Sequence, residues 1–96
     1  MPTFIRLDTL TEEGIKNVKN FSKMLGEARE IMERHGVTLL YGWATLGEYD
    51  VIAVVDAPDA KTAAQVSALI AAQGNFHTKT LAAIPLPEFG DVLKEG

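Results

Sequence analysis

The stretch TLGEYDVIAVVDAPD, from Thr45 to Asp59, decides how this 96-residue chain folds. Gly47 and Glu48 predict a tight reversal, and every residue from Val51 to Val55 is apolar. Because successive side chains of a strand point to opposite faces of a sheet, this strand is apolar on both of its faces. Such a strand belongs in the middle of a sheet that is covered on both sides.

Three further segments are rich in aromatic and β-branched residues, which favour strands. Together with the run above, the predicted strands are Thr3–Leu7, Val37–Leu46, Tyr49–Ala57 and Phe76–Ile84. Alternation in the first strand predicts Ile5 and Leu7 on one face, with Phe4 and Arg6 on the other. In the second strand, alternation from Val37 through Leu39 predicts that Tyr41 and Trp43 lie on one face with them.

Two helical regions separate these strands. The first begins at Thr9 or Thr11, has an irregular turn at residues 17–22, and continues as an amphipathic helix from Phe21 to His35. The second runs from Ala60 to about Gln73, with Asp59 as its N-cap and Gly74 at its end.

The order strand, helix, strand, strand, helix, strand predicts an α+β domain with the ferredoxin-like βαββαβ fold over residues 1–84, followed by a C-terminal tail over residues 85–96. Right-handed crossovers place the first and third strands at the centre of a four-stranded antiparallel sheet. The helices cover only one face of that sheet, which leaves Ile52 and Val54 bare. We therefore expect a homodimer packed sheet to sheet, with higher oligomers left open.

Composition excludes several classes of protein. The formal net charge is −4 and the pI is near 5.0, which argues against a nucleic-acid partner. The chain has no cysteine, so disulfides and thiolate metal sites are excluded. The opening MPTFIRLDTL has neither the pattern of a signal peptide nor that of a membrane span. We expect a soluble, cytoplasmic protein with no membrane partner.

Three blocks of the chain resemble the GYD-domain family. They are MPTFIRLDTLTEEG, LGEYDVIAVVDAPD and FHTKTLAAIPLPEF, and the Gly-Tyr-Asp pattern falls on Gly47, Tyr49 and Asp50. The resemblance implies a dimeric α/β barrel, in which two ferredoxin-like domains pack sheet to sheet. It implies little about activity, because the family is largely uncharacterised.

Tyr49 and Asp50 are the first candidate site residues. Asp50 could orient a ligand or act as a base, with the Tyr49 hydroxyl as a donor. The alternative is structural and is favoured: Asp50 accepts backbone N–H bonds at the turn, and Tyr49 packs against the end of a helix.

A second pair of candidates is Tyr41 and Trp43, which could line an apolar pocket for a small ligand. The favoured alternative places both rings in the core or in the dimer interface, where such residues are enriched.

Charged residues on neighbouring strands are the third candidate. Arg6 and Asp8 share a face of the first strand, and His77 and Lys79 share a face of the last strand. We expect a polar cluster on the sheet face opposite the helices, inside the barrel, as ion pairing or as a pocket. Three acids are predicted as alternative partners of Arg6: Asp8, Asp50 and Asp56.

No motif for a metal, phosphate or dinucleotide is present, so we predict no cofactor and no metal. The resemblance to dimeric α/β barrels, some of which carry or degrade haem, implies haem binding through His77 as an alternative. The leading interpretation is a homodimeric module that binds a small, partly apolar ligand in the barrel or in a sheet-edge cleft. One alternative is a cofactor-independent monooxygenase, isomerase or lyase that uses residues among Arg6, Tyr41, Asp50 and His77. The other is a structural assembly protein without a pocket, joined through the second strand.

Overall fold

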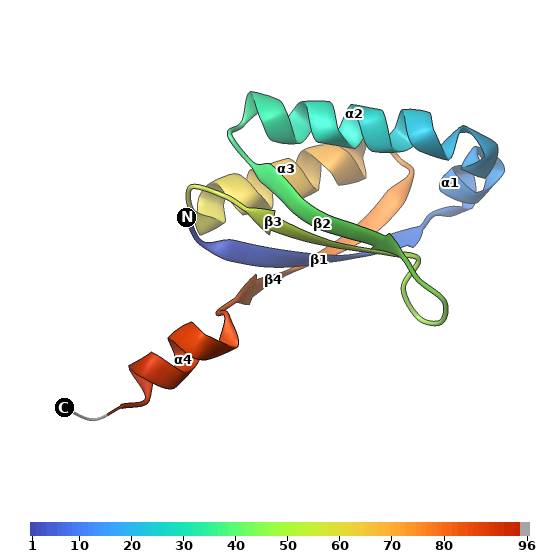
Figure 1. Cartoon of the computed structure of the whole chain (residues 1–96). Helices are drawn as coiled ribbons and strands as arrows, with labels where there is room; N and C mark the ends of the chain where they lie inside the picture. The colour runs from blue at the N-terminus through green and yellow to red at the C-terminus, as the bar shows by residue number, and fades with distance from the viewer. Residues whose placement is uncertain (95–96) are drawn as a thin grey trace.

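A computed structural model describes residues 1–94 of the chain. Its elements in order are β1 (Thr3–Leu10), α1 (Glu12–Lys16), the 3₁₀ turn η1 (Val18–Asn20), α2 (Phe21–Arg34), β2 (Thr38–Ala44), β3 (Val51–Asp56), α3 (Ala60–Ala72), β4 (Phe76–Ala83) and α4 (Leu86–Val92). The strands form one antiparallel sheet in the order β2-β3-β1-β4, and α2 and α3 lie on the same side of it (Figure 1). The predicted ferredoxin-like arrangement is confirmed, with β1 and β3 in the centre.

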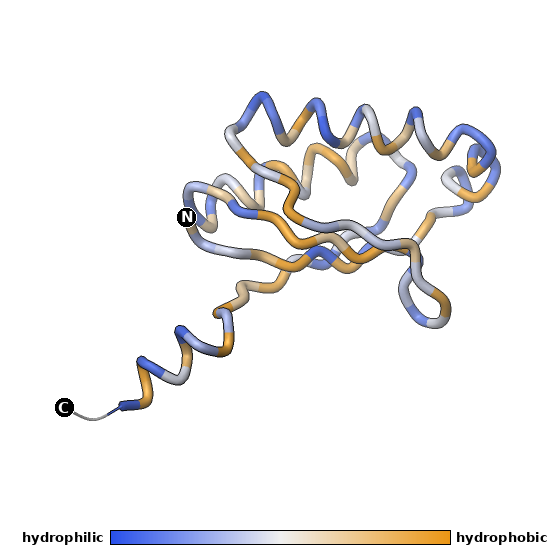
Figure 2. Tube along the Cα trace, viewed as in Figure 1, coloured by the Kyte–Doolittle hydropathy of each residue, from blue (hydrophilic) through white to orange (hydrophobic). Residues whose placement is uncertain are grey.

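The core lies between this sheet and helices α2 and α3. Side chains of β3 alternate along the strand: Val51, Ala53 and Val55 are buried toward the helices, whereas Ile52 and Val54 are only partly buried. In Figure 2 the apolar residues follow the strands and the inner side of α2, and the outer turns of α2 are hydrophilic. The buried apolar cluster consists of Phe4, Met24, Ala28, Ile31, Met32, Val37, Val51, Val55, Ala57, Ala63, Val66, Ile70 and Phe76.

Strand β1 extends to Leu10, three residues beyond its predicted end at Leu7. It does so because pairing with β4 continues as far as Leu10 opposite Phe76, so tertiary hydrogen bonds override the local helix signal. Of the two predicted helix starts, the one at Thr11 is correct: its side chain accepts a hydrogen bond from the backbone N–H of Gly14 at 2.9 Å.

Strand β2 departs from the predicted alternation. Its register with β3 shifts between Leu39 and Tyr41, so Leu39 lies opposite Val55 on the helix side, whereas Tyr41 lies opposite Val54 on the other side. An extra residue in one strand of an antiparallel pair forms a bulge, which inverts the facing of everything beyond it. The prediction that Leu39 shares a face with Tyr41 and Trp43 is therefore wrong.

The hairpin between β2 and β3 is a loop rather than the predicted tight reversal. Thr45 closes it: its N–H donates to the Asp50 carbonyl at 2.9 Å, and its hydroxyl donates to the Tyr49 carbonyl at 2.6 Å. Gly47 adopts φ +97°, a conformation that favours glycine. Strand β3 consequently begins at Val51, not at Tyr49.

Beyond β4 the chain forms a short helix within the segment expected to be a tail. Helix α4 points away from the sheet and from the other helices (Figure 1). Its apolar residues are exposed, with Leu86 at 81% and Val92 at 69% of their full accessibility. Over residues 1–94, the structure contains no helix with the length and apolarity that crossing a membrane requires.

Candidate functional site

The face of the sheet opposite the helices is apolar and uncovered in the protomer. Ile5 lies opposite both Val54 and Leu81 in neighbouring strands, and Leu7 lies opposite Ile52. We call this surface the open face; its apolar residues are Ile5, Leu7, Tyr41, Trp43, Ile52, Val54 and Leu81.

Tyr41 and Trp43 lie together on the open face. Their rings stack with centroids 5.7 Å apart and planes inclined by 7°. The two side chains are 61% and 51% exposed, so neither belongs to the core of the protomer. Of the uses expected for these residues, burial in the core is excluded; an interface remains for both, and a pocket remains for Trp43, which also lines the cleft between α2 and the sheet.

The predicted polar cluster on the open face does not form, because its members lie on opposite sides of the sheet. Arg6 lies opposite Ala53 and shares the helix side with the buried Phe4. His77 and Lys79 lie opposite Thr9 and Leu7 on the other side, and both are exposed. The alternation along β1 already placed Arg6 on the same face as Phe4, and Ile5 and Leu7 on the other face.

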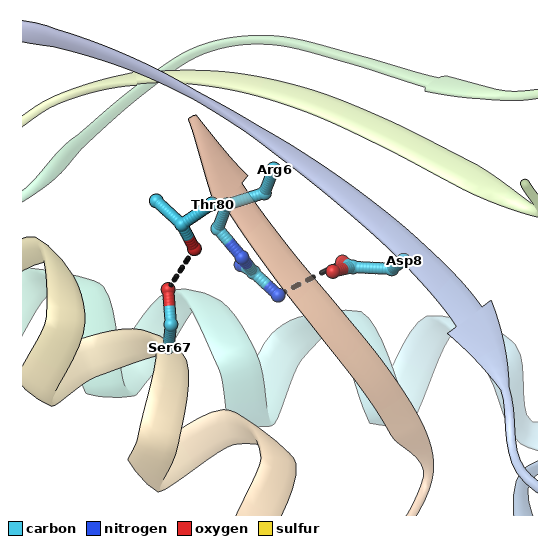
Figure 3. A network of polar contacts seen from close by, with 4 residues as sticks. All are labelled: Arg6, Asp8, Ser67 and Thr80. Atoms are coloured by element: carbon cyan, nitrogen blue, oxygen red, sulfur yellow. Dashed lines mark hydrogen bonds and ion pairs between the residues drawn. The ribbon is translucent and has the colours of Figure 1, made fainter. Parts of the chain in front are cut away.

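Arg6 and Asp8 form an ion pair inside the protomer. Arg6 Nη2 donates to Asp8 Oδ2 at 2.8 Å, and both side chains are 4% exposed. The pair projects from β1 toward the helices, near a hydroxyl contact of 2.6 Å between Ser67 of α3 and Thr80 of β4 (Figure 3). Of the three partners predicted for Arg6, Asp8 is the one that the structure selects.

The hydrogen bonding of this buried pair is incomplete. Arg6 Nε and Asp8 Oδ1 are buried and have no hydrogen-bond partner among residues 1–94. Burial raises the pKa of the Asp8 carboxyl, and the charge and hydrogen bond of Arg6 offset only part of that increase.

A cleft of about 440 Å³ lies between α2 and the sheet, on the side of edge strand β2. Arg6 and Asp8 line it together with apolar side chains from α2, β3 and β4. The residues that line it include Phe21, Leu25, Gly26, Arg29, Gly42 and Val51. Gly26 and Gly42 could not be recognised as cleft residues from any motif, because what they contribute is the open space beside their backbone.

The signature residues Tyr49 and Asp50 lie outside this cleft. Asp50 Oδ2 accepts the backbone N–H of Leu10 at 2.8 Å, and the N–H of Asp50 donates to the Asp8 carbonyl at 2.9 Å. These bonds attach the hairpin loop to the end of β1. Asp50 accepts a backbone N–H bond as expected, but the N–H belongs to Leu10 of the neighbouring strand and not to the turn. Tyr49 is half-buried, and the Lys79 ammonium lies 5.7 Å from the centroid of its ring.

The two other acids predicted to pair with Arg6, Asp50 and Asp56, form hydrogen bonds with other residues. Asp56 Oδ1 accepts a hydrogen bond from the hydroxyl of Thr3 at 2.9 Å, at the far end of the sheet.

Among residues 1–94, no three His, Asp or Glu side chains are grouped as a metal ion would need.

Comparison with known proteins agrees with the fold and the signature. The model of the GYD domain matches residues 4–93. A Thermus thermophilus protein named "Glutamine synthetase and cystathionine beta-lyase binding protein" is 39% identical over 89 residues, which span 92% of this chain and 94% of that protein. No solved structure matches. Since both matches extend along nearly the whole chain, this protein belongs to the GYD-domain family.

Proposed function

We propose that this chain acts as a homodimeric binding module whose principal partners are other proteins. The single observation that carries the proposal is the open face, on which Tyr41, Trp43 and Leu81 are all about half exposed or more. Clusters of this kind on a protein surface mark association sites.

The size of the open face supports dimerisation. Strands at about 3.3 Å per residue and about 4.8 Å apart give a four-stranded face of roughly 400–500 Å² for strands of this length. A stable interface buries about 800 Å² per partner, so the sheet supplies about half of it. The exposed apolar residues of α4, which projects beyond the sheet, supply further area. In a dimer with two-fold symmetry, the same surface of each protomer is buried in the interface.

The proposed partners of the dimer come from the relative. A chain that is 39% identical along nearly its whole length carries the name of a protein that binds glutamine synthetase and cystathionine β-lyase. We propose that the present chain binds the same two enzymes. A dimer suits this role because it presents every remaining surface twice, which raises avidity when the target is itself an oligomer.

Light scattering coupled to gel filtration tests the dimer. The protein should elute with twice its chain mass of 10.4 kDa, and Ile52→Glu on the open face should give a monomer. Leu69→Glu is the matched control, because Leu69 is an apolar residue of α3 that is 40% exposed on the outside of the protomer. A monomeric wild type at micromolar concentration contradicts the proposed dimer.

Biolayer interferometry with the two purified enzymes tests the partners. Binding by the wild type and by Leu69→Glu, with weaker binding by Ile52→Glu, is the expected pattern. If neither enzyme binds a protein that light scattering finds dimeric, the partner proposal fails and the dimer proposal stands.

A second function is favoured by the cleft beneath α2. Its volume of about 440 Å³ is within the range of about 300–1,000 Å³ that small-molecule sites occupy. We propose that a small, partly apolar ligand binds there, at the edge of the sheet, rather than in the barrel between two sheets.

A further inference from the structure

The unpaired atoms of the Arg6–Asp8 pair indicate which ligand the cleft would take. An arginine and a carboxylate can form two parallel hydrogen bonds, which use Nε, Nη2 and both carboxylate oxygens. Here one bond forms, between Nη2 and Oδ2, and leaves the Nε–H donor and the Oδ1 acceptor unpaired. The unpaired donor and the unpaired acceptor therefore belong to two ion-paired side chains that both line the cleft.

Stability alone gives no reason for this arrangement. Burying an ion pair is repaid only when further hydrogen bonds satisfy the remaining protons and lone pairs, and apolar residues of similar volume often do as well or better. Two of the residues that flank Arg6 on this face, Phe4 and Ala53, are apolar and buried, whereas its neighbour in β4 is Thr80, whose hydroxyl contacts Ser67. A charged pair among them, incompletely bonded and at the wall of a cleft, is typical of a recognition site.

We propose that the cleft binds a neutral, partly apolar molecule whose polar group carries a hydrogen-bond donor beside an acceptor, as a primary amide does, with Arg6 and Asp8 as its anchors. The carbonyl oxygen of the ligand accepts from Arg6 Nε–H, and its N–H donates to Asp8 Oδ1. This proposal rests on the second function proposed above, since it specifies the ligand of that cleft.

The charges near the cleft select a neutral group. Arg6 and Asp8 together carry no net charge, so an anion or a cation placed against them is buried without a counter-ion. Arg29 also lines the cleft, but its side chain is exposed, and ion pairs in water contribute little. Both anchor atoms are shielded from bulk water, so the proposed binding requires the Arg6 side chain to shift and expose them to the cleft.

The apolar part of the ligand lies between α2 and β2. Gly26 and Gly42 line this region, and a Cβ added to either glycine would meet no other atom within 4 Å. A larger side chain at either glycine would therefore occupy this part of the cleft without changing Arg6 or Asp8.

The test compares four molecules with the same ring system, titrated into the full-length, isotope-labelled protein and followed by NMR amide shifts. They are 2-naphthamide, methyl 2-naphthoate, 2-naphthoate and 2-naphthylmethylamine. We expect 2-naphthamide to shift the amides of Gly26, Gly42 and Val51 and to bind about tenfold or more tightly than the other three, because they lack one or both of the paired groups. Equal binding of all four at these residues overturns the ligand class and leaves the cleft function standing.

Two variants with a matched control complete the test. Arg6→Met combined with Asp8→Leu should abolish the preference for the amide over the ester, and Gly42→Val should abolish binding of both. Thr38→Val is the control, since Thr38 is in the same strand but opposite Asp56 on the open face. The proposal is overturned if the double variant retains the preference, or if 2-naphthoate binds best and loses that advantage in Arg29→Gln. Absence of every shift at the cleft overturns both the ligand class and the small-ligand function.

Discussion

Replacing Arg6 by methionine should destabilise the protein far more than replacing Arg6 and Asp8 together. Methionine keeps most of the length of the arginine stem but leaves the Asp8 carboxylate without its counter-ion. Both side chains are 4% exposed, so solvent screens this loss very little. Removing one partner of a buried pair costs about 3–5 kcal/mol.

The double variant removes the reason for that loss. In Arg6→Met/Asp8→Leu no buried charge remains, and the two atoms that lack hydrogen bonds are gone. Apolar replacement of a buried pair is commonly neutral or stabilising by about 1–4 kcal/mol. A chain of this size has a total stability of about 5–15 kcal/mol, so the single change would remove a large share of it and lower the melting temperature by roughly 12–40 °C.

Urea unfolding followed by circular dichroism measures both changes. All variants must be compared at one protein concentration, because dimerisation contributes to the apparent stability. Arg29→Met is the control, since an exposed arginine on α2 should change the unfolding free energy by no more than about 0.5 kcal/mol. The reasoning is refuted if Arg6→Met is as stable as the wild type, or if the double variant is as unstable as Arg6→Met.

Three further predictions concern single positions. Gly14→Ala should cost about 2 kcal/mol or more in urea unfolding, because a Cβ there would overlap the Asn75 carbonyl oxygen, and a loss below about 0.5 kcal/mol would contradict that packing. Asp50→Ala should lower thermal stability by about 1–3 kcal/mol because the Leu10 N–H loses its acceptor, whereas Asp50→Asn retains an oxygen there and should lose less; equal losses would argue against this bond. Because folding raises the pKa of Asp8 above 3.8, its contribution to stability is fully present below pH 3.8 and is lost as the pH rises through the folded value. The stability of the wild type relative to Asp8→Asn should therefore fall over that range, and a pH-independent difference would contradict it.

Much of the fold could be predicted because its signals are local. Alternation along β3, the Asp59 cap and the helical period of α2 depend on residues close in sequence, and the order of elements then restricts the topology to one arrangement. Asp59 Oδ1 accepts the backbone N–H of Thr62 at 2.7 Å, as predicted for an N-cap. Three blocks of the chain in the right order, one of which holds the Gly-Tyr-Asp signature, were enough to predict the family.

The candidate site could be predicted only in part. Arg6 was recognised as a charge that needs a partner, and Asp8 was among the partners considered. Its grouping with His77 was wrong, because the two residues are on opposite faces of adjacent strands. That outcome depends on the β1–β4 register, which pairs residues about seventy positions apart.

By itself, the sequence determined which segments are strands and helices, that the middle strand is apolar on both faces, and that a charged residue would be enclosed. Only the tertiary structure decided which side of the sheet encloses it, which acid pairs with it, and where β2 bulges so that Tyr41 and Trp43 turn to the open face. The physical reason is that helical period and strand alternation are properties of neighbouring residues. Strand register, and the cleft that α2 leaves above β2, arise from hydrogen bonds and packing between segments far apart in the chain.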